Sequence, residues 1–262
     1  MKNIKVLYLI LASCVLTFSA CEPTVEEDHL VNNVKIEDVD LKATNTTSGG
    51  NEVTLEMSTP GVTGYWDYVI GKGLTNRTTI VFPVTGTFNF KYKGTLGAEF
   101  FEKTVPVTIN VLDHPVPPEW TALLGIDAAA GKTWVFDGGP SPDGRQWWFM
   151  SDPNNPMGIW WNAAGDCCPP SDAAGKMHFD LDGALNFTYY SGPSASPSAG
   201  SFELNVKNQQ LIVVGTKILG AEGGGENSSG IYNIVELTED KMVLFIPNGP
   251  WGTGWTYVYK PE

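Results

Sequence analysis

Two pairs of adjacent tryptophans, Trp147–Trp148 and Trp160–Trp161, stand close together in the second half of the chain. Neighbouring side chains on a β-strand point to opposite faces of the sheet. Both members of a pair therefore cannot enter the core of a sheet that has one wet face. At least one indole of each pair is expected near the surface, where it can meet a ligand.

Strand alternation divides each pair between a core side and a solvent side. The ring that shares a face with a further apolar residue is expected in the core. The expected core residues are Trp147, Phe149, Ile159 and Trp161. Trp148 and Trp160 are left to face solvent. The alternative is that all four rings pack inside and support the fold.

An exposed indole beside polar loop residues suits a carbohydrate ligand. A pyranose has an apolar C–H face that can lie flat on an aromatic ring, while amide and carboxylate side chains bond its hydroxyl groups. Trp251 adds a third exposed ring, because it lies in the glycine-rich stretch NGPWGTGW. The residues expected to contact the sugar are Trp148, Trp160, Trp251, Gln146, Asn162 and Asp166. A second glycine-rich stretch, GAEGGGENSSG over 220–230, is expected to be a loop.

Hydrolysis of a glycosidic bond would require two placed carboxylates. Most acidic residues after residue 119 stand beside Gly, Pro or Ser, as the residues of ordinary turns do. They include Asp137, Asp143, Asp152, Asp166, Asp172, Asp180, Asp182, Glu222 and Glu226. His178 is the sole histidine of this region, and no Ser-His-Asp set is evident. The sequence favours binding without catalysis and points to no catalytic residue. A glycoside hydrolase with a carboxylate pair in this region is one alternative, and an adhesin or assembly module that binds protein is another.

Cys167 and Cys168 are the only cysteines after Cys21. Outside the cytosol they are expected to oxidise, and pairing with each other would give a stiff apolar knob. Reduced thiols or a bond between chains are the alternatives. No metal or other cofactor is predicted, because adjacent cysteines lack the spacing of a zinc site with His178. For Asp180-Leu181-Asp182-Gly183 a hairpin turn is favoured over a calcium site.

The N-terminus has the pattern of an export signal over residues 1–20. A basic start is followed by a short apolar run, too short for a comfortable membrane span. Phe18-Ser19-Ala20-Cys21 resembles a bacterial lipobox, which implies lipidation of Cys21. The acidic residues that follow resemble the stretch that routes lipoproteins of Bacteroidetes to the outer face of the outer membrane. Residues 21–35 would then be a flexible tether. A secreted protein cut near Ala20 is the alternative.

The formal net charge of the chain is −13, from 16 basic and 29 acidic residues. Phosphate binding needs a basic surface, so nucleic acid is excluded as a partner. An acidic surface fits a ligand that carries no net charge.

Period-two alternation, with Gly and Pro between segments, predicts an all-β fold along the rest of the chain. Residues 36–113 have the size of an immunoglobulin-like sandwich. Trp66-Asp67-Tyr68, Gly71-Lys72-Gly73 and Gly86-Thr87-Phe88 resemble the motifs of PKD-type domains, which implies a spacer with Trp66 in its core. Residues 114–118 are proline-rich and predict a linker. Residues 119–262 predict a larger, tryptophan-rich domain, either a β-sandwich or jelly roll, which is favoured, or a lipocalin-like barrel.

This combination of lipobox, PKD-like spacer and tryptophan-rich β domain resembles the surface glycan-binding lipoproteins of Bacteroidetes polysaccharide utilisation, the Sus-type family. The resemblance implies a lipid-anchored protein on the outer membrane. It also implies that the protein captures a neutral polysaccharide or oligosaccharide and delivers it to partner enzymes and an outer-membrane transporter.

Overall fold

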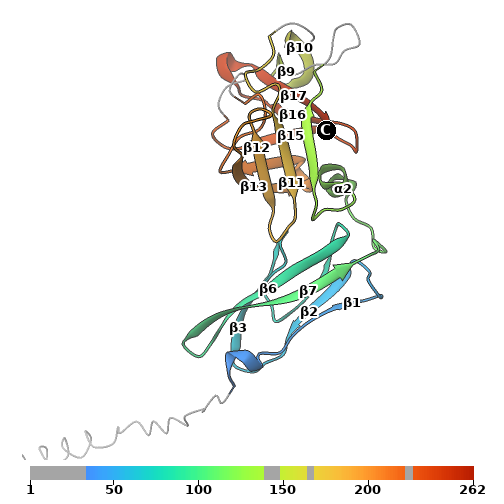
Figure 1. Ribbon diagram of the computed structural model, residues 1–262, viewed down its shortest axis with the longest axis vertical. Helices are drawn as coiled ribbons and strands as arrows, with labels where there is room; N and C mark the ends of the chain where they lie inside the picture. The colour runs from blue at the N-terminus through green and yellow to red at the C-terminus, as the bar shows by residue number, and fades with distance from the viewer. Residues whose placement is uncertain (1–33, 139–147, 164–167, 222–226) are drawn as a thin grey trace, which may run out of the picture. The chain divides into compact units, whose positions relative to one another are not determined.

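The computed structural model describes residues 34–138, 148–163, 168–221 and 227–262. Its elements are almost all strands (Figure 1). Residues 35–262 form one compact unit. The expected signal peptide, Cys21 and most of the tether lie outside the described residues. Within the described ranges, no helix has the length and apolar character that a membrane crossing requires.

The first part of the chain forms two antiparallel sheets with orders β1-β2-β5 and β4-β3-β6-β7. A 3-10 turn, η1 (Ile36–Asp38), precedes them. The described strands of this part are β1 (Leu41–Asn45), β2 (Glu52–Met57), β3 (Val62–Asp67), β4 (Lys72–Gly73), β5 (Arg77–Val81), β6 (Gly86–Leu96) and β7 (Glu99–Ile109). Buried and partly exposed residues alternate along β2, as one core-facing side requires.

Aromatic side chains fill the core between these two sheets. Phe82, just after β5, packs against Phe88 and Phe90 of β6, with ring centroids 4.6 and 5.2 Å apart. Trp66 on β3 is fully buried and meets the edge of Tyr92 at 5.2 Å. The expectation that Trp66 lies in the core is confirmed.

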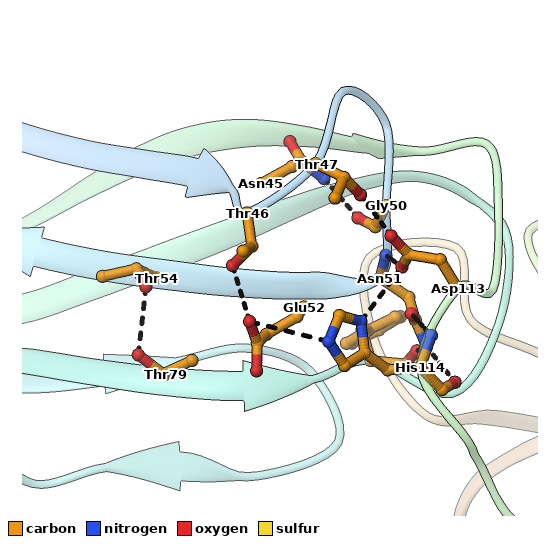
Figure 2. A network of polar contacts seen from close by, with 11 residues as sticks. Asn45, Thr46, Thr47, Gly50, Asn51, Glu52, Thr54, Thr79, Asp113 and His114 are labelled. Atoms are coloured by element: carbon orange, nitrogen blue, oxygen red, sulfur yellow. Dashed lines mark hydrogen bonds and ion pairs between the residues drawn. The ribbon is translucent and has the colours of Figure 1, made fainter.

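A polar network ties the end of this part to its β1–β2 loop (Figure 2). The Asn51 amide is buried, donates to the carbonyl oxygens of Phe82 and His114 at 3.1 Å, and accepts from the His114 N–H at 2.8 Å. The Asp113 carboxylate accepts from the Thr47 hydroxyl, from His114 Nδ1 at 3.1 Å and from the Asn51 N–H at 3.1 Å. These hydrogen bonds, led by the one from Thr47, lower the pKa of Asp113 to about 2.

The second part of the chain forms a closed eight-stranded barrel with order β8-β11-β12-β13-β14-β15-β16-β17, in which β17 also pairs with β8. The strands are β8 (Lys132–Phe136), β11 (Lys176–Asp180), β12 (Asn186–Tyr190), β13 (Ser198–Asn205), β14 (Gln210–Val214), β15 (Ile231–Leu237), β16 (Met242–Ile246) and β17 (Gly254–Pro261). The closed barrel matches the alternative of the sequence analysis, not the favoured sandwich or jelly roll.

Two further strands, β9 (Trp148–Asp152) and β10 (Asn155–Ala163), belong to the same sheet. β9 pairs with the edge of β17 that faces away from β16, and β10 pairs with β9. Residues 259–261 of β17 pair with β8, whereas residues 254–257 pair with β9. Thus β8 and β9 occupy successive lengths of the same edge of β17. Together β8 and β9 therefore act as one interrupted barrel strand. β9 and β10 form an added hairpin at one end of the barrel.

The barrel interior is packed with side chains. Phe179 of β11 contacts Phe187 of β12 at 4.7 Å and Phe202 of β13 at 5.3 Å. The segment between β14 and β15 adds Ile218 and Leu219, both fully buried. Such a filled barrel is a scaffold that holds its connecting loops in place.

A short helix, α2 (Pro118–Leu124), precedes the barrel and packs on it. Pro118 stands in the first turn, where its missing N–H costs nothing. Leu123 and Leu124 are fully buried, and the Leu123 carbonyl accepts the indole N–H of Trp134 at 3.0 Å. The expected hairpin turn also occurs, since 181–183 lies between β11 and β12, and a 3-10 turn, η2 (Val206–Asn208), joins β13 to β14.

Candidate functional site

Three tryptophans meet where the β9–β10 hairpin joins β17. Trp148 stacks on Trp255 with ring centroids 5.0 Å apart and an interplanar angle of 26°. Trp161 meets Trp148 edge-on at 5.9 Å and Trp255 at 6.4 Å. The Trp148 indole N–H donates to the Cys168 carbonyl at 3.3 Å. The cluster is rigid because β9, β10 and β17 are hydrogen-bonded to one another.

The prediction that Trp148 faces solvent is wrong, since only 8% of its surface is exposed. Both faces of β9 are covered. Trp255 and Trp161 cover Trp148 on one face, while Phe149 on the other packs with Val243 and Val258. Alternation cannot tell the core side of a strand from its solvent side when both sides are buried.

Trp160 is 55% exposed, as expected. Its neighbours differ from expectation, because Ile159 is exposed and Trp161 is 36% exposed, although both were predicted in the core. The pairing of β10 with β9 shifts register on each side of Ile159. A β-bulge of this kind breaks the simple alternation, so Trp160 and Trp161 both reach the surface.

Trp251 is the most exposed large apolar side chain of the described residues, at 84%. It lies in η3 (Pro250–Gly252), the loop between β16 and β17, with φ 60° and ψ 18°. The Gly249 N–H donates to the Thr253 carbonyl at 2.7 Å and closes the loop beneath it. A bulky residue in the left-handed region is uncommon and costs energy, which points to a role other than folding.

The polar residues expected at the site are only partly described. Gln146, Trp147, Asp166 and Cys167 lie outside the described residues. Asn162 is half-buried on β10, and within the described ranges its Oδ1 has no hydrogen-bond partner. Cys168 is disulfide-bonded. The expected partner, Cys167, remains a prediction.

A cleft of about 650 Å³ lies beside the loop that carries Trp251. Among the described residues, its lining holds four amide side chains and two serines, and none that is charged. The lining residues are Gln210, Asn227, Asn233, Asn248, Ser228, Ser229, Ile231, Ile246, Pro247 and Gly249. Sequence reasoning missed it, because its walls come from β14, β15 and two loops. The only local signal was the Asn-Ser-Ser end of the glycine-rich stretch over 220–230.

Three of the described acidic residues of this part make structural contacts. Asp172 is buried, accepts from the Tyr189 hydroxyl at 2.8 Å, and accepts from the Gly220 N–H at 3.0 Å. Asp137 pairs with Lys260 at 3.6 Å, and Asp152 caps its own turn through the Asn154 N–H at 2.8 Å. Asp143, Glu222 and Glu226 lie outside the described residues.

Buried tyrosines line the barrel beside Asp172. Burial raises the pKa of Tyr232 to about 12. Burial, with smaller contributions from Tyr232 and Asp172, also raises the pKa of Tyr257. These hydroxyls therefore stay protonated at neutral pH.

The Asp180–Gly183 turn has the contacts of a plain hairpin. Asp180 Oδ1 accepts from the Asp182 N–H at 2.9 Å and from the Asn186 amide at 2.7 Å. Among the described residues, no group of three or more His, Cys, Asp or Glu side chains is placed to hold a metal ion.

No protein-family model matches the chain, and no curated protein matches it. A crystal structure of a protein of unknown function from Bacteroides thetaiotaomicron is similar at 9% sequence identity, with a TM-score of 0.18. The match covers 78% of this chain and 55% of that one, so this chain corresponds to about half the length of that protein.

Proposed function

We propose that the protein binds a neutral polysaccharide or oligosaccharide without cleaving it. The exposed tryptophans Trp160 and Trp251 receive the apolar faces of sugar rings, and polar side chains near them bond the hydroxyl groups. Trp148 is buried and supports the site by packing against Trp161 and Trp255 and holding them in place.

The observation that carries this proposal is the exposure of Trp251, 84% open to solvent on a backbone with φ 60°. Removing a large apolar side chain from water is favourable. An exposed indole in an uncommon backbone conformation is therefore typical of a surface that binds a partner. An uncharged cleft beside it suits a partner without charge, and the formal net charge of −13 disfavours an anionic one.

The proposal extends to the rest of the chain. Lipidation of Cys21 would anchor the protein to the outer face of the outer membrane. Residues 36–113 would act as a PKD-type, immunoglobulin-like spacer, and the barrel would present the glycan to partner enzymes and a transporter, as in Sus-type lipoproteins. Two sheets sharing an aromatic core, with Trp66 buried on β3, support the spacer part of this proposal.

Affinity electrophoresis through gels that contain neutral β-glucan, α-glucan, mannan or xylan tests the proposal. We expect at least one polysaccharide to retard the protein, with no sugar released on prolonged incubation. Trp160→Ala and Trp251→Ala should each reduce the retardation. Phe100→Ala is the matched control, because Phe100 is an equally exposed aromatic residue on β7. Mobility unchanged in every gel contradicts the proposal, and released oligosaccharide would indicate a hydrolase instead.

A further inference from the structure

We infer that the cleft beside Trp251 is the hydrogen-bonding half of the glycan site, with Gln210, Asn233 and Asn248 as its specificity-determining residues. The inference rests on the proposed function and adds the side chains that read the hydroxyl groups. It also limits the ligand to sugars without a carboxylate or sulfate group.

The amides of this cleft fall into two groups. Asn227 holds the loop, because its Nδ2 donates to the Ile231 carbonyl at 2.7 Å and its Oδ1 accepts from the Ser229 hydroxyl at 2.6 Å. Gln210 and Asn233 share one contact of 3.4 Å between Gln210 Nε2 and Asn233 Oδ1. That contact leaves the Gln210 carbonyl and the Asn233 N–H groups to bond a ligand.

Asn248 is an exposed residue of the cleft lining and precedes Trp251 by three positions in the loop. No hydrogen bond of its side chain is found within the described part of the chain. A primary amide offers both donors and acceptors, which matches a sugar hydroxyl that is itself donor and acceptor. Acidic or basic side chains would favour charged ligands, and none stands in the part of the lining that the structure describes.

A buried indole lies behind the cleft wall at Gly249. Trp255 is buried, and its Nε1 has no hydrogen-bond partner among the residues described. A Cβ added to Gly249 would lie 2.8 Å from this nitrogen and 2.2 Å from Trp255 Cδ1. The N–H therefore lies against the cleft wall at Gly249. Gly249 therefore fixes this part of the cleft wall against the Trp255 ring.

Isothermal titration with neutral oligosaccharides of the gel-positive polysaccharide tests the inference. Each amide that bonds a neutral hydroxyl contributes a net free energy equivalent to roughly 3- to 10-fold in affinity. Asn233→Ala and Asn248→Ala should each weaken binding by that factor. Asn89→Ala, which removes an exposed amide on β6, is the control and should bind as the wild type does. Far-UV circular dichroism and the unfolding midpoint verify that each variant is folded.

Four outcomes are distinguishable. Weaker binding by the cleft variants, with an intact control and no binding of polygalacturonic acid, supports the inference. Unchanged binding by both cleft variants while Trp251→Ala loses binding overturns the cleft but leaves the proposed function standing. No binding by the wild type to any neutral oligosaccharide overturns both. Equal binding of polygalacturonic acid overturns the restriction to uncharged sugars.

Discussion

Two tryptophans near the β16–β17 loop differ in their roles: one packs inside the fold, and the other is proposed to bind the ligand. Trp255 is buried and lies against Gly249, whereas Trp251, four residues earlier, stands in solvent. The glycine-rich loop that carries Trp251 is therefore required for two reasons: Gly249 gives room to the Trp255 ring, and the tight loop presents Trp251.

Replacing Gly249 by alanine should destabilise the protein. The added Cβ would lie 2.2 Å from Trp255 Cδ1, so the ring or the loop must shift, at a cost of about 1–3 kcal/mol. Urea unfolding followed by tryptophan fluorescence measures this difference. Gly192→Ala is the matched control, because nothing lies within 4 Å of its Cβ position, and its unfolding free energy should stay close to that of the wild type. Equal stability of the two variants would contradict the tight contact at Gly249.

Asp113 gives a pH-dependent prediction in the first part of the chain. The pKa of its carboxyl is lowered from 3.8 to about 2, chiefly by the hydrogen bond from Thr47. A lowered folded-state pKa adds stability above pH 3.8, and this stability is lost as the pH falls through 2. The difference in unfolding free energy between wild type and Asp113→Asn should therefore be constant near neutral pH and shrink below pH 3.8. A difference that does not change down to pH 2 would show that the carboxylate has no such role.

Individual strands show what the sequence could and could not predict. Trp66 was placed in the core from its resemblance to a PKD-type motif, and it lies on β3, whose sheet has one dominant core face. Trp148 was misplaced because β9 is buried on both faces, and Trp161 because β10 carries a bulge. Periodicity is informative only where a strand is regular and has one wet face.

The segment between β14 and β15 depends on one buried carboxylate. Asp172 binds the Tyr189 hydroxyl at 2.8 Å and the Gly220 N–H at 3.0 Å. Hydrogen bonds to a charged group contribute about 1.5–3 kcal/mol each, so Asp172→Ala should cost roughly 3 kcal/mol or more. Chemical denaturation of Asp172→Ala, Tyr189→Phe and the double variant measures the coupling between the two side chains. Strict additivity of the two losses would contradict the contact.

The sequence predicted a barrel only as the alternative to a favoured β-sandwich or jelly roll. Closure depends on the pairing of β8 with β17, in which Trp134 lies opposite Pro261, and no local pattern reports a pairing between such distant residues. The cleft was missed for the same reason, since Gln210, Asn233 and Asn248 are brought together by strand pairing and a loop. The exposed Trp251 could be predicted from the glycine-rich stretch around it, and Trp160 from strand alternation within a tryptophan pair.

The charge of the whole molecule leads to a prediction about salt. A chain with a net charge of −13 that binds through rings and amides should show little electrostatic attraction to its ligand. The affinity for a neutral oligosaccharide should therefore change less than about twofold between roughly 0.05 and 0.5 M sodium chloride. Titration calorimetry at several salt concentrations measures it. A steep decrease with salt would point to an ionic ligand.

The most direct measurement is the affinity of the Trp160→Ala/Trp251→Ala double variant for a neutral oligosaccharide that the wild type binds. Both rings are exposed, so their removal should change the unfolding midpoint very little. We predict that the double variant unfolds like the wild type and has lost measurable binding. Wild-type affinity in the folded double variant would contradict the claim that these two indoles receive the sugar.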